Sequence, residues 1–307
     1  MKVLLVGGLG FIGKRFIRKF SGIHEIIVYA RYDDISKTKE ILNMKNVLLE
    51  EGAVENKKII DIIVKHKPDV VIHLAALTGL MKCHDSPEKA FKINVYGTFN
   101  VANACSKTHS KLIFISSREV YGNTINDESG EDSPLFPNNT YGMTKMLGEI
   151  LIKQESERSN FDYTILRLTN VYGPEGDQYG AQVIIRNAVE LQKIQILGGN
   201  QTLNYVYVDD VVDCIGLVLS NKKSSRQIFN VGSEDTFSIE QFVDKVIQII
   251  GTEIEIQYGP MRETETSNFK PDLKKIKDYL GFEAKTSLEI GLKKTIEWCI
   301  SNPVIDD

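Results

Sequence analysis

Three residues of this chain could together move a proton at a hydroxyl group. Tyr141 and Lys145 stand four residues apart in "YGMTKMLGE", so on a helix they share one face. A tyrosine is a weak base at its ordinary pKa of about 10, and a lysine ammonium one turn away favours the phenolate. Ser117, in "FISSREVYG", can hydrogen-bond the same substrate oxygen. A tyrosine and a lysine at this spacing are commonly a surface pair, so the interpretation depends on what accompanies them.

The accompanying group is indicated by the start of the chain. The run "VLLVGGLGFIG" at 3–13 predicts a strand, a glycine turn and the start of a helix. Gly7 permits a tight turn, Gly10 lets the backbone approach a pyrophosphate, and Gly13 allows the helix to pack closely on the sheet. The helix N-terminus then attracts the anion. The alternative is a turn that needs glycine only for positive φ. We predict a dinucleotide whose nicotinamide moves a hydride at the carbon where Tyr141 moves the proton.

The end of the second predicted strand bears on which dinucleotide binds. An acidic side chain there binds the ribose hydroxyls of NAD, whereas an arginine accommodates the 2′-phosphate of NADP. The chain reads "VYARYDD" at 28–34, with Ala30 and Arg31 at the discriminating positions. This favours NADP, although Arg31 can equally be a solvated loop residue and Asp33 can reach the ribose. NAD and NADP therefore both stay open.

The elements that must position these residues alternate regularly over the first 170 residues. Aliphatic runs at 3–6, 25–29, 70–74, 112–116 and 163–168 predict strands, and helical periodicity covers 13–20, 57–65, 87–106 and 141–158. Further strands are predicted at 228–232, rejoining the sheet, and at 253–258. We expect an α/β fold: a Rossmann doubly wound parallel sheet at 1–171 plus about 204–232, and a smaller C-terminal α/β substrate lobe at about 172–203 and 233–307.

Composition limits the partners of the protein. The 307 residues are 42% hydrophobic and 25% charged, with a formal net charge of -4. Without a basic excess to neutralise phosphates, we expect no nucleic-acid partner. We expect no membrane insertion and no export, since no apolar run reaches the length of a span and no signal peptide precedes the first strand. The four cysteines lie far apart, form no metal-ligand spacing and suit a cytoplasmic protein with reduced thiols.

Seven motifs, in this order, resemble the extended short-chain dehydrogenases/reductases of the NAD-dependent epimerase/dehydratase group. They are the glycine turn, "VVIHLAA" at 70–76, "NVYGTFNV" at 94–101, "SSREVYG" at 116–122, the tyrosine and lysine pair, "RLTNVYGP" at 167–174 and "YVYVDDVV" at 205–212. The resemblance covers nearly the whole chain. It implies a tightly bound nicotinamide cofactor, a nucleotide-sugar substrate, and a homodimer formed through the helices that start near Pro87 and Tyr141.

The resemblance also implies roles for individual residues. The catalytic residues are Ser117, Tyr141 and Lys145, with Glu119 as a further candidate base. The cofactor would contact Gly7, Gly10, Phe11, Ile12, Gly13, Arg31, Leu74, Ala75, Ala76, Tyr141 and Lys145, and the substrate would contact Thr78, Ser117, Asn170 and Arg262. No metal site is expected. His73 can line the cofactor or be an ordinary buried histidine, and we expect Asn94 to steady the backbone by hydrogen bonding.

The chain departs from the family pattern at the cofactor and at the diphosphate. Ala30 and Ala53 replace acidic residues that contact the ribose and the adenine. Where the family has Gln-Thr-Arg-Asp, this chain has Leu203 at the arginine position, so one phosphate-binding cation is missing. Such a charge-assisted hydrogen bond contributes about 1.5 to 3 kcal/mol. Arg262 matches a second family arginine, and Arg186 and Lys193 are further candidates or ordinary solvated residues.

A further departure follows the catalytic serine. Sugar 4,6-dehydratases need an acid and a base there, often an Asp-Glu pair, but Arg118 stands at the acid position and cannot donate a proton near neutral pH. Glu119 could serve as the base or could pair with Arg118. We expect an epimerase that forms a 4-keto sugar of a UDP-sugar type substrate. The alternatives are an NADPH-dependent 4-keto-sugar reductase and a catalytically silent dinucleotide-binding sensor.

Overall fold

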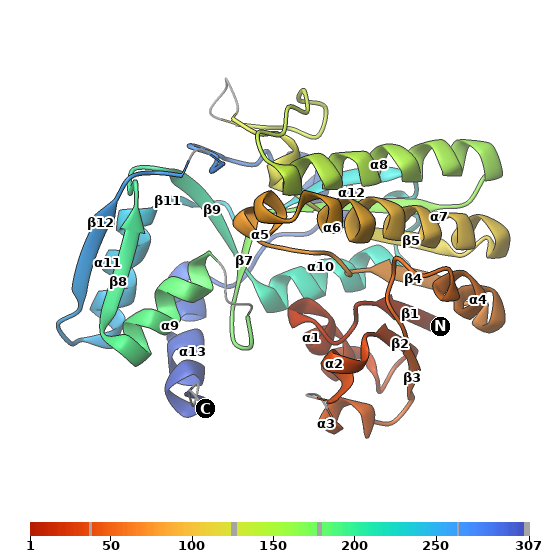
Figure 1. Cartoon of the computed structure of the whole chain (residues 1–307), viewed down its shortest axis with the longest axis horizontal. Helices are drawn as coiled ribbons and strands as arrows, with labels where there is room; N and C mark the ends of the chain where they lie inside the picture. Colours follow the sequence, from red (N-terminus) through yellow and green to blue (C-terminus); the bar gives the residue numbers. More distant parts are fainter. Residues whose placement is uncertain (37–38, 124–127, 177–179, 263, 304–307) are drawn as a thin grey trace.

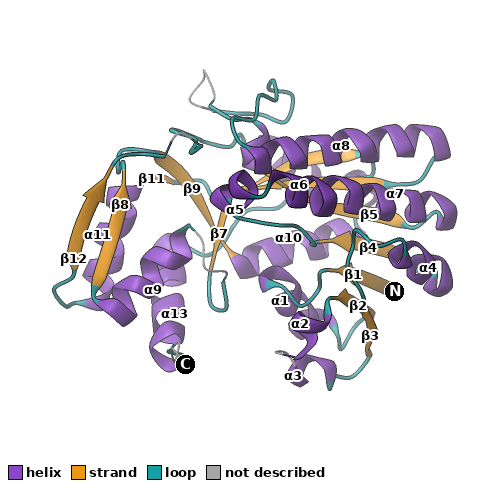
Figure 2. Ribbon diagram, viewed as in Figure 1, coloured by secondary structure: helices purple, strands orange, loops and turns teal. Residues whose placement is uncertain are grey.

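A seven-stranded parallel sheet forms the centre of the molecule in the computed structural model, which describes residues 1–36, 39–123, 128–176, 180–262 and 264–303 (Figures 1 and 2). Its strand order is β10-β6-β5-β4-β1-β2-β3, reversing between β1 and β4. The strands are β1 (Lys2–Val6), β2 (Glu25–Ala30), β3 (Val47–Glu51), β4 (Val70–His73), β5 (Lys111–Ser117), β6 (Tyr163–Leu168) and β10 (Gln227–Val231). This order confirms the predicted doubly wound sheet, whose reversal point is where such folds bind ligands.

Helices cover both faces of this sheet. One layer, which shares one hydrophobic cluster, holds α1 (Phe11–Phe20), α10 (Val208–Ser220) and α12 (Lys274–Leu280). The other layer, with a second cluster, holds α4 (Lys58–His66), α7 (Gly97–Thr108) and α8 (Thr140–Ser159). Neighbouring strand residues point to opposite layers, so Leu5 joins one hydrophobic cluster and Leu4 the other. This double burial explains why the strands read as continuous aliphatic runs.

Short helices complete the connections of this part of the chain. They are α2 (Tyr32–Ser36), α3 (Lys39–Leu42), α5 (Leu80–Asp85), α6 (Pro87–Ala90), the π-helix η1 (Phe91–Tyr96), and the 3-10 helices η2 (Arg118–Val120) and η3 (Lys222–Ser224). The elements α6, η1 and α7 follow one another from Pro87 to Thr108, where the sequence predicted one helix over 87–106. None of the described helices combines the length and apolar character needed to cross a membrane.

The C-terminal part has its own hydrophobic cluster, which includes Ile185, Phe242 and Leu292. It contains a three-stranded sheet of β7 (Asn170–Tyr172), β9 (Thr202–Tyr207) and β11 (Thr236–Ser238), the strand pair β8 (Lys193–Leu197) and β12 (Glu255–Gly259), and the helices α9 (Ala181–Leu191), α11 (Ile239–Ile250) and α13 (Leu288–Ser301). The sequence predicted β10 and β12 but missed β3, β7, β8, β9 and β11. Several of these strands are short and partly exposed, which leaves a weak hydrophobic pattern.

Candidate active site

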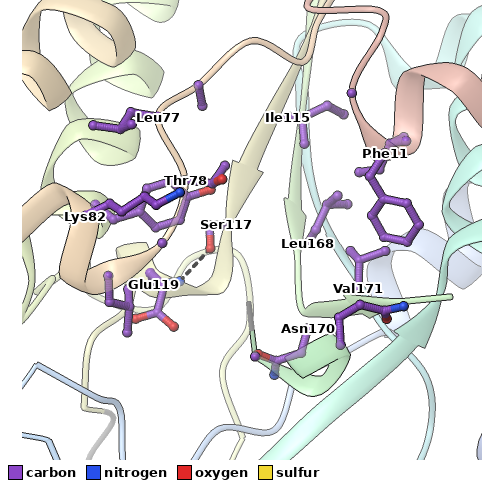
Figure 3. A pocket seen from close by; sticks show the side chains of 18 of the residues that line it. Phe11, Leu77, Thr78, Lys82, Ile115, Ser117, Glu119, Leu168, Asn170 and Val171 are labelled. Carbon is purple, nitrogen blue, oxygen red and sulfur yellow. Dashed lines mark hydrogen bonds between the residues drawn. The ribbon is translucent and has the colours of Figure 1, made fainter. Parts of the chain in front are cut away.

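A cavity of about 1020 Å³ opens at the carboxyl ends of the sheet strands and extends to the C-terminal part. Its size lies at the upper end of the ~300–1,000 Å³ common for ligand pockets. In Figure 3, Thr78, Ser117 and Glu119 lie on one wall and Phe11 and Val171 on the opposite one. The structure brings every predicted site residue to this cavity: Gly7, Gly10, Phe11, Ile12, Gly13, Arg31, Leu74, Ala75, Ala76, Thr78, Ser117, Glu119, Tyr141, Lys145, Asn170 and Arg262.

The glycine turn closes tightly between β1, β4 and α1. Gly7 has a φ of 78°, and a Cβ added there would lie 2.7 Å from the Cα of Ala75. At Gly13 a Cβ would lie 2.3 Å from the carbonyl oxygen of Gly8, so larger residues would separate helix and sheet. Gly10 precedes α1, and no side chain of the described residues caps this helix. Its first N–H groups are therefore available to an anion in the cavity, which fits a pyrophosphate.

Arg31 lies at the rim of the cavity just after β2. Its Nε donates to Oδ2 of Asp34 over 3.2 Å, and 59% of its side chain is exposed. Asp34 also lines the cavity. Arg31 can therefore reach a ligand there, but only in exchange for a partner that it already holds.

Lys145 is held beneath the reacting residues. Its side chain is buried, and Nζ donates to the carbonyl oxygen of Ile115 over 2.7 Å. The same Nζ lies 5.8 Å from the ring centroid of Tyr141, one helical turn away on α8. Burial lowers the pKa of Lys145 to about 8. Its charge, in this low-dielectric position, favours the ionised form of the Tyr141 phenol, and Ser117 ends β5 on the same cavity wall.

The segment after β4 is fixed from below by Asn94. The Asn94 side chain accepts from Leu77 N over 2.7 Å and donates to Leu77 O and to Thr144 Oγ1, each over 3.0 Å. This agrees with the predicted backbone role of Asn94, which lies in a π-helical turn of the kind often found near functional sites. His73 is fully buried, its Nε2 lies 3.0 Å from Thr98 Oγ1, and burial lowers its pKa to about 3. The structure thus supports the alternative in which His73 is an ordinary buried histidine, in its neutral form.

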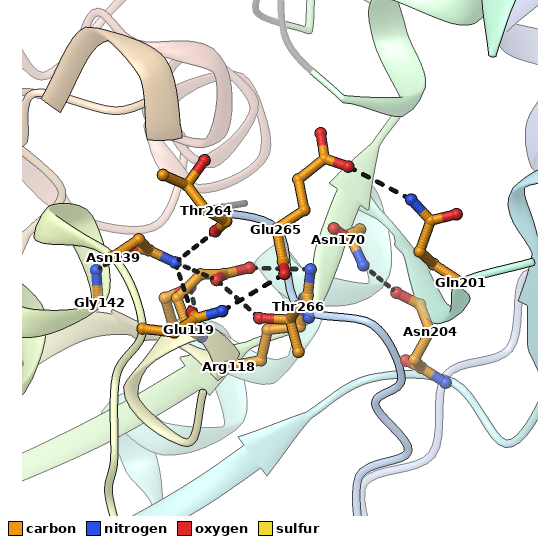
Figure 4. A network of polar contacts seen from close by, with 12 residues as sticks. Arg118, Glu119, Asn139, Gly142, Asn170, Gln201, Asn204, Thr264, Glu265 and Thr266 are labelled. Carbon is orange, nitrogen blue, oxygen red and sulfur yellow. Dashed lines mark hydrogen bonds and ion pairs between the residues drawn. The ribbon is translucent and has the colours of Figure 1, made fainter. Parts of the chain in front are cut away.

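Glu119 is engaged by three neighbours (Figure 4). Its Oε1 pairs with Arg118 over 2.8 Å, and its Oε2 accepts from Asn139 Nδ2 over 2.8 Å and from Thr266 Oγ1 over 3.2 Å. Asn139 in turn caps α8 by accepting from the N–H of Gly142. The alternative in which Glu119 pairs with Arg118 therefore agrees with the structure. Both carboxylate oxygens are therefore occupied by donors of the protein itself.

The far end of the cavity carries few cations. Arg262 lines it beside Glu265, with 3.5 Å between Arg262 NH1 and Glu265 Oε1, and Leu203 lines it without a charge. Asn170 donates to the carbonyl oxygen of Asn204 over 2.8 Å and faces the same space. Arg186 and Lys193 are not among the lining residues, and they pair with Glu190 and Glu255. Lys193 is the ordinary solvated residue of the sequence alternative, whereas Arg186 is largely covered and lies over the ring of Trp298.

Several lining residues were not predicted as site residues. They are Lys82, Arg118, Thr169, Tyr205 and Glu265. Lys82 and Glu265 lie in segments with no motif, so no sequence signal could have indicated them. Arg118 and Thr169, in contrast, each follow a recognised strand end, and their place in the parallel sheet could have indicated them.

Comparison with known proteins agrees with this geometry. Residues 3–232 match the sequence profile described as the NAD dependent epimerase/dehydratase family. The chain belongs to this family. It is 30% identical to human dTDP-D-glucose 4,6-dehydratase (98% of this chain, 90% of that protein) and to the UDP-N-acetyl-alpha-D-glucosaminuronate decarboxylase of Bacillus cytotoxicus (97% of each). The solved UDP-glucose 4-epimerase of Thermotoga maritima, with UDP-glucose, is 30% identical with a TM-score of 0.90 over 97% of this chain and 98% of that one.

These relatives carry out different reactions, so family membership shows an epimerase/dehydratase-type enzyme acting on nucleotide sugars without fixing the reaction. The predicted family and fold class are confirmed.

Proposed function

We propose that the protein is a nicotinamide-dependent nucleotide-sugar 4-epimerase. The observation that carries this proposal is one cavity that joins the glycine turn, the set of Ser117, Tyr141 and Lys145, and the polar end at Asn170 and Arg262. A related enzyme of this architecture was solved with UDP-glucose. The cavity, at about 1020 Å³, lies at the upper end of the volumes common for ligand pockets.

The cofactor fits the turn between β1 and α1. We assign the pyrophosphate to the N–H groups after Gly10, and the nicotinamide half to the side formed by Leu74, Ala75 and Ala76. When bound, the nicotinamide supplies a reversible hydride acceptor for the sugar C4.

The protein residues move the matching proton. Tyr141, as phenolate, removes the proton of the 4-hydroxyl, and the positive charge of Lys145 stabilises that phenolate. Ser117 donates a hydrogen bond to the same oxygen as it becomes a carbonyl. The 4-keto sugar then rotates within the cavity, so that its opposite face is presented for reduction. Asn170 and Arg262 hold the diphosphate meanwhile, and Thr78 contacts the sugar. Tyr141 returns the proton when the opposite face of C4 has been reduced.

We assign Glu119 a supporting role in place of the predicted catalytic one. Its carboxylate links Arg118 to Asn139, the cap of the helix that carries Tyr141. Dehydration would require a free base and an acid at 118 and 119, and the arginine cannot donate a proton near neutral pH. This disfavours a dehydratase.

Arg31 supports a second candidate, an NADPH-dependent 4-keto-sugar reductase. Its guanidinium stands at the cavity rim where a 2′-phosphate would lie, and no acidic residue occupies position 30. In that reaction Tyr141 would protonate the 4-keto oxygen once, and a bound reduced dinucleotide would supply the hydride at C4.

We further propose that two chains associate through α7 and α8. Apolar side chains are exposed around these helices, namely Phe91, Tyr96, Phe99, Met143 and Ile150. The two helices lie side by side on one face of the sheet (Figure 1).

Sedimentation tests this association and should give twice the mass of one chain. Phe99→Glu should give monomers, whereas Tyr258→Glu on the distant β12 should not.

The test of the function uses UDP-sugars without added cofactor. NMR should show inversion at C4 of UDP-glucose or UDP-glucuronic acid, with no solvent deuterium at C4, because the hydride returns from within the enzyme. Conversion only when NADPH is supplied to a 4-keto sugar would instead support the reductase.

A further inference from the structure

Arg118 lies in the floor of the cavity, directly after the catalytic Ser117. Only 6% of the residue is exposed, although it lines the cavity. Its guanidinium stands 5.6 Å from the ring centroid of Phe269, and its NH2 pairs with Glu119 over 2.8 Å. In Figure 4 it lies between Glu119 and Asn170. Arg118 therefore reaches toward the place where the sugar would sit between Ser117 and Asn170.

One edge of this guanidinium is unsatisfied. The NH1 of Arg118 is buried and has no hydrogen-bond partner among the described residues. The hydroxyl of Thr169, a residue that is 7% exposed and also lines the cavity, is likewise buried without such a partner. A buried donor without an acceptor costs about 1–3 kcal/mol, and more when it is charged. Two such donors at one cavity point to a ligand that supplies the acceptors.

Sheet register brings the backbones of these two residues close together. Ser117 of β5 pairs with Leu168 of β6, so Arg118 and Thr169 are the next residues at two adjacent strand ends. Parallel strands lie about 4.8 Å apart. The two backbones are therefore neighbours, next to Ser117 in the wall of the cavity. A guanidinium edge with a free N–H is the kind of donor that a carboxylate accepts from.

We propose that Arg118, with Thr169, binds an ionised carboxylate on the sugar, so that the substrate is a nucleoside diphosphate-linked hexuronate. This rests on the proposed nucleotide-sugar function and names its substrate class. Glu119 occupies the guanidinium through NH2 and leaves NH1 open to a second acceptor. An uncharged hydroxymethyl group would leave the guanidinium edge without an anionic acceptor, and the site then discriminates against it.

The diphosphate is the other anion of the substrate. Its expected contacts, Asn170 and Arg262, lie farther along the cavity, while Arg118 follows the serine that faces the reacting carbon. The experiment separates the two sources, because UDP carries the diphosphate without any sugar carboxylate.

The test measures dissociation constants of UDP, UDP-glucose and UDP-glucuronic acid by calorimetry, on the protein with its resident cofactor. Wild type should bind UDP-glucuronic acid at least about tenfold tighter than UDP-glucose. Arg118→Met should weaken UDP-glucuronic acid about 10- to 100-fold and leave UDP and UDP-glucose within about threefold. Arg262→Met should weaken all three ligands together, and Lys193→Met, an exposed residue outside the cavity, should weaken none.

A second variant guards against misfolding. Arg118→Met/Glu119→Gln removes the charge pair as a whole, so no buried carboxylate loses its cation. It should show the same selective loss, and Arg118→Lys should recover only part of it, because an ammonium lacks the planar fork. Equal weakening of all three ligands would assign Arg118 to the diphosphate, and no weakening would make it structural; either result overturns the proposal. Inversion at C4 of UDP-glucose would still support the epimerase in both cases.

Discussion

Two buried arginines, Arg167 on β6 and Arg118 just after the neighbouring strand β5, differ in how their donors are used. Arg167 donates through Nε and NH2 to the Glu149 carboxylate over 3.0 and 2.7 Å. Its NH1 donates to the Tyr121 hydroxyl and to the backbone carbonyl oxygen of Glu131, each over 2.9 Å. Arg118, at the end of β5, has Glu119 as an ion-pair partner and leaves NH1 unsatisfied. Arg167 is saturated by the protein itself, whereas Arg118 still has a donor to offer.

This difference separates structure from ligand binding within one sheet. The Arg167 cluster lies under α8 and ties the helix to β6 through Glu149. The residues around Arg118 face the cavity, as do Tyr141 and Lys145. We therefore expect different consequences of mutation in the two regions. Mutations in the Arg167 cluster should lower stability, and mutations around Arg118 should lower binding or turnover.

The largest effect is expected at Tyr141. Tyr141→Phe removes the proton-transferring hydroxyl and should lower kcat by about 10²- to 10⁴-fold, with the urea midpoint unchanged. Tyr258→Phe, at a residue that is 65% exposed on β12, is the control and should retain full turnover. Unchanged activity of Tyr141→Phe would remove this tyrosine from the mechanism.

Arg167→Met should act on stability. It leaves the Glu149 carboxylate buried without its cation, and such loss typically costs about 3–5 kcal/mol in unfolding free energy. Urea unfolding measures it. The double variant Arg167→Met/Glu149→Leu should recover much of the loss, because it removes both charges. A stable Arg167→Met with weakened UDP-sugar binding would contradict the structural role.

Lys145 contrasts with Arg167 in its pKa. Burial lowers the pKa of Lys145 from 10.5 to about 8, whereas the hydrogen bonds and charge of Glu149 outweigh burial at Arg167 and raise its pKa. The lysine loses its charge above about pH 8, so kcat/KM should fall there as the phenolate loses its support. Between about pH 8 and 10.5, Lys145 is protonated in the unfolded chain but neutral in the folded one. The free energy of unfolding should therefore rise with pH over this window in the wild type, compared with Lys145→Met. A kcat/KM that stays level to pH 10.5 would contradict this assignment.

The smallest effect is expected at Arg31. Its guanidinium is largely exposed and already paired with Asp34, so its contact with a 2′-phosphate is screened. Arg31→Ala should weaken NADP about 3- to 10-fold and leave NAD unchanged, measured by calorimetry on cofactor-free protein. Equal affinities of the wild type for NAD and NADP would show that Arg31 does not bind the 2′-phosphate.

The sequence predicted the parallel sheet and the cavity residues because both depend on local signals. Strands buried on both faces read as aliphatic runs, and the glycine turn and the spacing of Tyr141 and Lys145 are set by a few neighbouring residues. The small strands such as β8 and β11 pair with segments far along the chain, and their own pattern is weak. The donor left open on Arg118 could not be predicted, since it depends on where Glu119, Asn139 and Thr266 meet.

The most direct test of the proposed epimerase is to denature freshly purified protein and identify any released nicotinamide dinucleotide by mass spectrometry. An epimerase keeps and regenerates its cofactor, so we expect oxidised dinucleotide in a one-to-one ratio with the chain, and its mass shows whether the 2′-phosphate is present. Protein that releases nothing and then binds NADPH in preference to NADH would contradict the epimerase and support the reductase.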